Sequence, residues 1–293
     1  MKKCFNLLLT ACLLAFANLA NAQDQSFFDE AGNISEELQT NLPTSGPKEG
    51  LEPIEMVNPR ADDIYWQKVV YRIIDLREKM NFPLYYPELP ADNRTSFFAL
   101  MFRLVQDGKV KVYDYAEEYE HFDDQHMTKF RDLLDKFALP YETKLDSITN
   151  DTIYIIDDTD VPNRDIIKYF CKEVWYFDRI SSTFNCRIIG FCPVMQREGD
   201  TGLETLPLFW IPFETLRPFL SQTEVLITDK NNGARPSFDD LFMKRRFSSY
   251  IYKESNVQNR TLLEYNTTLE DVKKEQEMVK TRLINFETDL WEY

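Results

Sequence analysis

The chain has 293 residues, of which 43% are hydrophobic and 14% aromatic, and this composition excludes wholesale disorder. It carries 34 basic and 49 acidic residues, and the resulting net charge of −15 disfavours nucleic acid and anionic membranes as partners and suits basic proteins. A chain of this length can hold one large or two modest domains.

The first 22 residues, MKKCFNLLLTACLLAFANLANA, have the features of a secretory signal peptide. Lys2 and Lys3 precede an apolar run, and Ala-Asn-Ala at 20–22 is a small-x-small cleavage site. The run is shorter than the ~20 residues that a membrane-spanning helix needs. Residues 9–12, Leu-Thr-Ala-Cys, also form a candidate lipobox, so a lipid anchor at Cys12 is the alternative to soluble export. Loss of the leader leaves 32 basic residues against 49 acidic ones, a net charge of −17.

Residues 23–61 form a predicted extended arm, because scattered prolines and glycines interrupt any helical or strand periodicity. Isolated apolar residues along it are candidate anchors for a partner, namely Phe27, Phe28, Leu38 and Ile54. Two interpretations stay open. The arm is either a flexible linker or a segment that becomes ordered on a neighbouring subunit.

The rest of the chain contains one pattern twice, which predicts two related α+β halves at residues 62–150 and 151–293, each with a β-hairpin and packed helices. FFALMFRLVQDGKVKVYD in the first half resembles PFETLRPFLSQTEVLITD in the second. Each is an apolar helix with one arginine, followed by a β-rich run that ends in aspartate. DDQHMTKF after Phe122 likewise resembles DDLFMKRRF after Phe238. Upstream of these blocks, VVYRIIDLREKMNFPLYYP in the first half occupies the position of VWYFDRISSTFNCRIIGFCP in the second. The three matched blocks follow one another in the same order in both halves.

Residues 172–194 predict a β-hairpin, because apolar and polar residues alternate on both sides of Ser181-Ser182. A turn centred between these serines would place Cys171 opposite Cys192, close enough for a disulfide. Separate buried thiols are the alternative. The counterpart at residues 69–87 fits either a helix or a strand, and its match to the hairpin favours the strand.

The C-terminus predicts a long helix over residues 268–292, with Thr267 and Glu270 as a capping box. Its apolar positions alternate in spacing between three and four residues, as in a helix-pairing seam. The seam residues are Leu269, Val272, Gln276, Val279, Leu283, Phe286 and Leu290. The seam either docks on the protein's own core or pairs with a helix of a partner, so its apolar members are candidate interface residues.

The two histidines of the chain and the two aspartates between them form a candidate metal cluster, His121, Asp123, Asp124 and His126. The histidine spacing of five residues directs the two rings apart around a helix, unlike the four-residue spacing of a zinc-protease helix. In the apparent second copy, Phe242 takes the position of His126. A solvated helix start is therefore the favoured interpretation.

The sequence lacks other motifs of metal sites and enzymes. The acidic stretch IDDTDVPNRD lacks the glycine and the final glutamate of an EF-hand, and no glycine-rich phosphate loop or GxSxG motif occurs. Cys192 has no histidine known to lie near it. The sequence thus predicts no catalytic, cofactor-binding or metal-binding residue. The alternatives are an exported metal-dependent hydrolase that uses the histidine cluster, and a free periplasmic binding module.

Five sequence blocks follow one another between Trp66 and Tyr293: WQKVVYRIIDLREKMNFPLYYP, KEVWYFDRISSTFNCRIIGFCPV, LFWIPFETLRPFL, SFDDLFMKRRFSSYIYKESN and DLWEY. Together they resemble the GldN/PorN family of Bacteroidota. They cover nearly the whole region expected to fold, so the resemblance is specific. The proline-rich arm is the part that it covers least.

The resemblance implies a non-catalytic structural component of the type IX protein secretion system, which is also needed for gliding motility. Family members lie in the periplasm at the inner face of the outer membrane, in a ring with an outer-membrane lipoprotein of the GldK/PorK type. The ring meets the periplasmic region of a GldM/PorM-type motor protein. The expected partners are these two proteins and further copies of the chain, without nucleic acid. No enzymatic activity, cofactor or binding residue is transferred.

Overall fold

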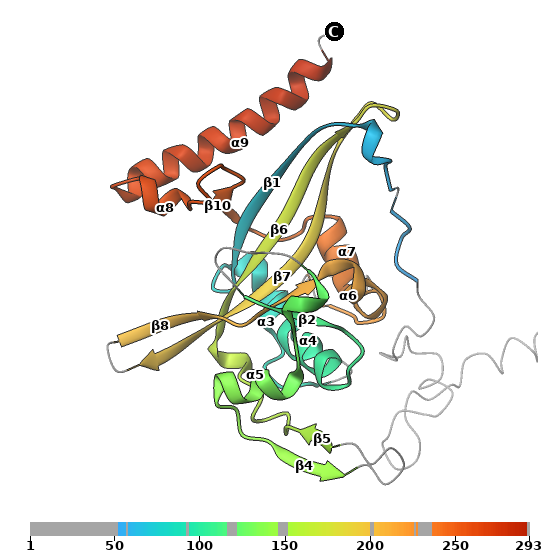
Figure 1. Cartoon of the computed structure of the whole chain (residues 1–293), viewed down its shortest axis with the longest axis vertical. Helices are drawn as coiled ribbons and strands as arrows, with labels where there is room; N and C mark the ends of the chain where they lie inside the picture. Colours follow the sequence, from blue (N-terminus) through green and yellow to red (C-terminus); the bar gives the residue numbers. More distant parts are fainter. Residues whose placement is uncertain are drawn as a thin grey trace, which may run out of the picture. The chain divides into compact units, whose positions relative to one another are not determined.

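The computed structural model describes residues 52–56, 58–91, 94–115, 122–145, 152–199, 202–225, 227 and 236–291, all within one compact unit, Pro47–Tyr293. The fold is α+β, as expected (Figure 1). The elements in chain order are η1 (Ala61–Asp63), β1 (Ile64–Asp75), η2 (Lys79–Asn81), α3 (Phe82–Tyr85), α4 (Phe97–Gln106), β2 (Val112–Asp114), η3 (Asp124–His126), β3 (Met127–Thr128), α5 (Phe130–Phe137), β4 (Glu142–Leu145), β5 (Thr152–Ile155), η4 (Asn163–Asp165), β6 (Ile166–Asp178), β7 (Thr183–Gly199), β8 (Gly202–Pro207), β9 (Phe209–Pro212), α6 (Phe213–Leu220), α7 (Phe238–Met243), β10 (Tyr250–Glu254), α8 (Leu262–Tyr265) and α9 (Leu269–Trp291).

One large antiparallel sheet organises the fold, with the strand order β10-β1-β6-β7-β9-β2-β3 and with β8 paired to β7. Its long central strands β1, β6 and β7 lie side by side in Figure 1. Strands of both expected halves thus share one sheet. Whether the halves are duplicates of one another stays a prediction. A second sheet consists of β4 and β5.

The predicted hairpin is confirmed as β6 and β7, but its turn lies one residue earlier than expected. Asp178 pairs with Thr183, so residues 179–182 form the turn, and Ser182 takes a left-handed φ of 52°. The Asp178 carboxylate accepts hydrogen bonds from the Ser181 hydroxyl and the Ile180 N–H. These bonds favour the charged form and lower the pKa of Asp178.

The first hairpin expected from the sequence, at residues 69–87, is replaced by one strand and a helical segment. Residues 69–75 belong to β1, as the internal match favoured, and β1 pairs with β6 and β10. The chain then continues through η2 into α3 instead of returning as a strand. Pro83 favours this course of the chain, because it lies in the first turn of α3, where proline lacks no helical hydrogen bond.

Apolar residues cover both faces of the sheet. The largest core lies on one face, where β6 contributes Tyr169 and Cys171 and the helices α4, α5, α6 and α7 contribute most of the remaining buried residues. Phe170, between the two, belongs to a smaller cluster with Cys192 and Trp210 on the opposite face. The alternation of side chains along β6 therefore sets which residues meet the helices.

Helix α9 docks on the protein's own sheet. Val279 and Leu283 are buried in a third cluster with Val70 of β1, and the Phe286 ring stacks on Trp66 at 4.5 Å. Its cap differs from the expected one by one residue, because the Thr268 hydroxyl accepts from the Asp271 N–H and donates to the Asp271 carboxylate. Neither α9 nor another helix among the described residues has the length and apolarity needed to cross a bilayer.

Candidate functional site

The predicted metal cluster is only partly within the described residues, because His121 lies outside them. Asp123 and Asp124 are exposed at η3, and the Asp124 carboxylate lies 3.4 Å from the Lys111 ammonium group. The Nδ1 atom of His126 is buried and has no hydrogen-bond partner among the described residues. Within that part of the chain, no three His, Cys, Asp or Glu side chains are grouped to hold a metal ion.

The predicted Cys171–Cys192 disulfide is wrong, and the register of the hairpin explains why. Cys171 pairs with Phe191, and Cys192 pairs with Phe170, because the turn is shifted and a bulge follows at Lys172/Glu173. A shift of one residue in a strand moves a side chain to the other face of the sheet. The two cysteines therefore belong to different clusters on opposite faces, and both are free thiols.

A buried ionic cluster lies beside Cys171, on the same face of the sheet. The Glu173 carboxylate is fully buried and accepts from Arg72 at 3.0 Å and from Arg245 at 2.8 Å. The Trp175 indole N–H donates to the same carboxylate at 3.2 Å, and the guanidinium groups of both arginines lie over the Trp175 ring. The cluster satisfies a buried charge between β1, β6 and the residues that follow α7.

The thiols next to this cluster are not activated. Burial, together with the negative charge of Glu173, raises the pKa of Cys171 and that of Cys186 well above the usual range of a thiol. A nucleophilic cysteine needs a lowered pKa, because the thiolate is the reactive form. The arrangement therefore serves packing and charge satisfaction, and thiol chemistry is disfavoured.

The described end of the arm is attached to the folded body. The Ile54 carbonyl accepts from the Arg217 guanidinium at 2.6 Å, and Arg217 is itself buried and paired with Asp239 on α7. The Asn58 side chain accepts from Arg187 at 2.6 Å. The Ile54 side chain is 64% exposed. The other predicted anchors of the arm, Phe27, Phe28 and Leu38, lie outside the described residues.

The predicted seam of the C-terminal helix is largely used within the chain. Val279 and Leu283 are buried, Val272 is partly buried, and Phe286 packs on Trp66 and Phe184. Leu269 is exposed, and the side chain of Leu290 lies outside the described residues. The core-docking interpretation is thus the one that the packing supports for the middle of the helix.

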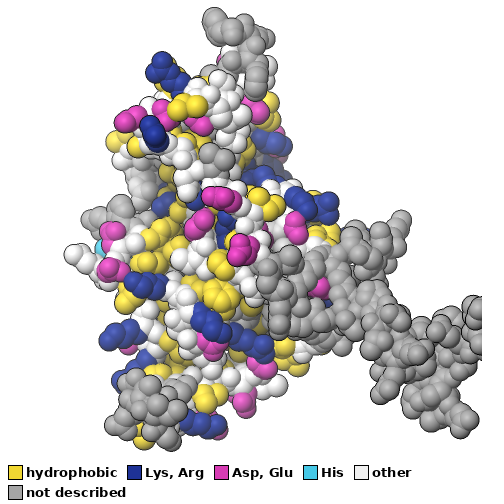
Figure 2. Space-filling view, turned by 90° about the vertical axis from the view of Figure 1, so that its right-hand side faces the viewer, with side chains coloured by type: hydrophobic (Ala, Val, Ile, Leu, Met, Phe, Trp, Pro, Cys, Tyr) yellow, Lys and Arg dark blue, Asp and Glu magenta, His cyan; other side chains and the backbone are white. Residues whose placement is uncertain are grey.

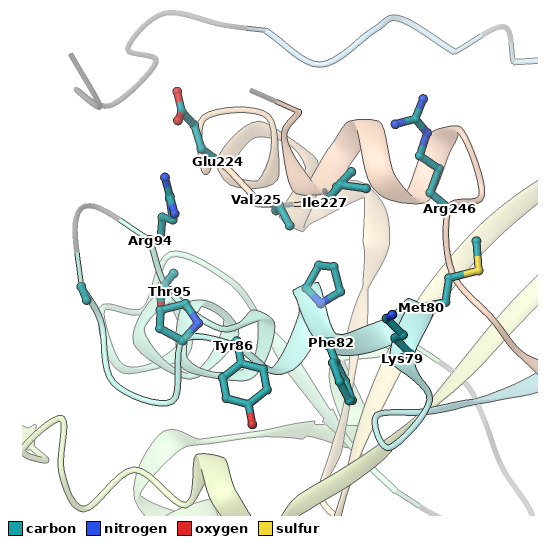
Figure 3. A pocket seen from close by; sticks show the side chains of 13 residues that line it. Lys79, Met80, Phe82, Tyr86, Arg94, Thr95, Glu224, Val225, Ile227 and Arg246 are labelled. Atoms are coloured by element: carbon teal, nitrogen blue, oxygen red, sulfur yellow. The ribbon is translucent and has the colours of Figure 1, made fainter. Parts of the chain in front are cut away.

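An open groove of about 780 Å³ lies between the η2–α3 segment and the residues that follow α6 (Figure 3). Phe82 and Tyr86 line it on the α3 side, and Val225 lies across from them. Other apolar lining residues are Met80, Pro83, Pro87 and Ile227. We call it the α3 groove. Figure 2 shows one side of the molecule, on which apolar side chains are exposed among basic and acidic ones.

The local sequence explains why the α3 side of the groove is apolar. Within α3, Leu84 points into the core and is buried, which leaves Phe82 and Tyr86 on the outer side, 43% and 54% exposed. The buried Asn81 side chain holds the start of the helix, because it donates to the Asp75 and Ser248 carbonyls at 2.7 and 2.9 Å. The Asn81 side chain also accepts from the Ser248 N–H at 2.8 Å, so it is hydrogen-bonded to both backbone groups of Ser248. The groove therefore has a fixed wall.

Charged residues at the α3 groove are mainly basic. Lys79, Arg94 and Arg246 line it, and none of them forms an ion pair with another residue that the structure describes. Among the lining residues that the structure describes, the one acidic residue is Glu224, which is 8% exposed. Cations without a local carboxylate partner attract an acidic ligand, and the apolar walls favour one that also carries aromatic or aliphatic side chains.

Sequence reasoning missed this groove, because its described lining comes from three parts of the chain, residues 79–95, 224–227 and 246, and the first lies far from the other two. NFPLYYP was one available signal, since two prolines and three aromatic residues within seven positions fit neither strand nor helix periodicity. The match between residues 69–87 and the hairpin drew the interpretation toward a strand instead.

Comparison with known proteins gives one family. A family model described as gliding motility associated protein GldN matches residues 59–292, which is nearly the whole described region. No curated protein matches the chain.

Proposed function

This chain belongs to the GldN family of gliding motility associated proteins of the type IX secretion system, and from that premise we propose that it is a non-catalytic structural subunit of the machinery. In this proposal it assembles in the periplasm, at the inner face of the outer membrane, in a ring with an outer-membrane lipoprotein of the GldK/PorK type. The ring contacts the periplasmic region of a GldM/PorM-type motor protein. The observation that carries the proposal is the family match over residues 59–292.

The chemistry of the buried polar groups supports a structural role. The Glu173 carboxylate forms ion pairs with two arginines, which suits it to packing and not to proton transfer. The pKa values of the Cys171 and Cys186 thiols are raised, which disfavours nucleophilic attack by either thiol. The exposed α3 groove supports contact with a protein partner, because it combines apolar walls with cations that have no carboxylate partner in the part of the chain that the structure describes.

Co-purification from the native envelope tests the proposal. The full-length chain with a C-terminal tag is extracted in mild detergent, and the untagged chain taken through the same steps is the control. We expect an outer-membrane lipoprotein to co-purify in a fixed ratio with the tagged chain only. A tagged chain that emerges alone, while secretion is intact in the same cells, would contradict the proposal.

A further inference from the structure

The α3 groove is an apolar surface without an occupant among the described residues. Met80, Phe82 and Tyr86 expose 55%, 43% and 54% of their surface there. Clusters of exposed large apolar side chains on a folded chain mark contact sites more often than isolated ones do. Since the Asn81 hydrogen bonds hold the α3 wall, a ligand meets a preformed surface.

The charge of the groove narrows the choice of occupant. Lys79, Arg94 and Arg246 have no carboxylate partner among the described residues, although the chain as a whole is strongly acidic. An occupant with carboxylates beside aromatic side chains would satisfy the cations and cover the apolar walls together. A basic or purely aliphatic segment would leave the cations unpaired.

The arm of this chain has that chemistry. Residues 23–51 contain six acidic residues and one lysine, and DQSFFDE at 24–30 places two phenylalanines between acidic residues. The segment therefore offers two aromatic anchors, Phe27 and Phe28, with Asp24 on one side and Asp29 and Glu30 on the other.

The point at which the arm leaves the folded body favours contact with a neighbour. Ile54 is bonded to Arg217 on α6, and the residues that follow α6 line the groove. The 23 residues between Phe28 and Glu52 can extend roughly 80 Å. A folded unit of this size is only about 45 Å across. A tether of this length is longer than a contact with the chain's own α6 side requires, and it is long enough to reach an adjacent copy.

We propose that the α3 groove binds the acidic Phe27–Phe28 segment of a second copy of this chain. The inference rests on the proposed function in one respect, namely that copies of the chain assemble side by side. It adds the site of the contact: the phenylalanines cover Phe82 and Tyr86, and the carboxylates pair with Arg94, Arg246 and Lys79.

Photo-crosslinking in the native envelope tests this contact. A photoreactive phenylalanine analogue replaces Tyr86 in the full-length chain, and the matched control replaces Tyr65, an aromatic residue of β1 that is 76% exposed and is not a groove residue. We expect covalent dimers from the Tyr86 position, with the crosslink mapped to residues 23–42, at a yield at least tenfold above the Tyr65 position.

Three results of the crosslinking would overturn the inference. They are a crosslink to the arm of the same chain, a crosslink to a different protein, and no crosslink in extracts where the chain runs as a large assembly. The last result would leave the proposed function intact. A chain that runs as a monomer in the same extracts would instead overturn the proposed function, so the two failures are distinguishable.

Charge reversal tests the ionic part of the contact. Arg94→Glu with Arg246→Glu should lower the dimer yield from the Tyr86 position at least fivefold, because the carboxylates of the arm then meet like charges. Asp29→Lys with Glu30→Lys in the same chain should restore it. The control is Lys144→Glu in β4, which is exposed and outside the groove and should leave the yield unchanged. A double reversal without effect, or one without rescue, would refute the pairing.

Discussion

At the scale of single residues, Glu173 is held by contacts from three other side chains, those of Arg72, Arg245 and Trp175. It is a buried carboxylate that faces two arginines, and it lies between the large core and the cluster beneath α9. On β1, Val70, Arg72 and Ile74 point to one face, so the ionic contact of Arg72 interrupts an otherwise apolar row. The cluster thus ties β1, β6 and the end of α7 at a defined position.

Glu173→Gln should lower the free energy of unfolding by about 3 kcal/mol, because it leaves Arg72 and Arg245 without their anion in a largely buried site. Urea denaturation followed by circular dichroism measures the change. The matched control is Asp158→Asn, which removes one partner of the exposed Arg103–Asp158 pair and should cost less than about 1 kcal/mol. Equal losses in the two variants would show that Glu173 is not held as described.

The cysteines show why residue-level contacts were difficult to predict. The alternation of residues 172–194 is sufficient to predict a hairpin, but facing pairs depend on the exact turn and on any bulge. Here the Asp178 hydrogen bonds close the turn one residue early, which displaces each facing pair by two residues and by itself keeps both cysteines on one face. The bulge at Lys172/Glu173 then moves the pairing back by one residue and places the two cysteines on opposite faces. Neither feature has a signature in the alternation, and a one-residue error reverses the face.

At the scale of elements, α9 joins the sheet through one side only. Leu283 is buried against the sheet, and Ile284, the next residue, is 51% exposed. The alternating spacing of three and four residues along the helix predicted that α9 has one apolar stripe. The stripe alone could not distinguish docking on the chain's own core from docking on a partner. The packing of Phe286 on Trp66 resolves the choice for this part of the helix, because both residues come from one chain.

Leu283→Ala should lower the free energy of unfolding by about 3 kcal/mol, since it leaves a cavity between α9 and the sheet. Ile284→Ala is the matched control and should change it by no more than about 0.5 kcal/mol. Urea denaturation of the two variants side by side gives the comparison. A Leu283→Ala variant as stable as its control would mean that the apolar stripe of α9 is not docked on the sheet in solution.

The strand and the helical segment at residues 69–87 show how similarity between segments can mislead. The internal match correctly favoured a strand at 69–75, which is now part of β1. It also suggested a return strand, whereas the chain enters α3, with Pro83 in the first turn of that helix. The α3 groove exists because of that departure, and this is the physical reason that no sequence pattern pointed to it.

At the scale of the whole molecule, the sheet unites the two expected halves. β1 comes from the first half and β6 from the second, and their pairing runs from Ile64 to Asp75. The large core draws residues from both halves as well, among them Phe97 of α4 and Phe242 of α7, whose rings lie 4.9 Å apart. The α+β class was predictable from the sequence, but the sharing of one sheet depends on pairing between distant segments.

We expect the chain to run in native extracts, after mild detergent treatment, far above the 34.7 kDa of a single copy. The physical reason is that the proposed subunit presents a preformed groove and a long acidic arm to its neighbours. Size-exclusion chromatography with light scattering measures the mass. A single species of monomer mass would contradict a ring of copies.

The placement of β1 beside β10 has a mechanical consequence. The arm leads into β1 at Ile64, and the segment toward α9 leaves β10 at Glu254. Because the two strands are antiparallel, with Val70 opposite Glu254 and Ile73 opposite Tyr250, both connections leave the ladder toward the same end. Tension between the arm and α9 would therefore peel β10 from β1 one pair at a time and would not shear all the pairs together. The docking of α8 and α9 over Val70 and Ile251 resists that peeling.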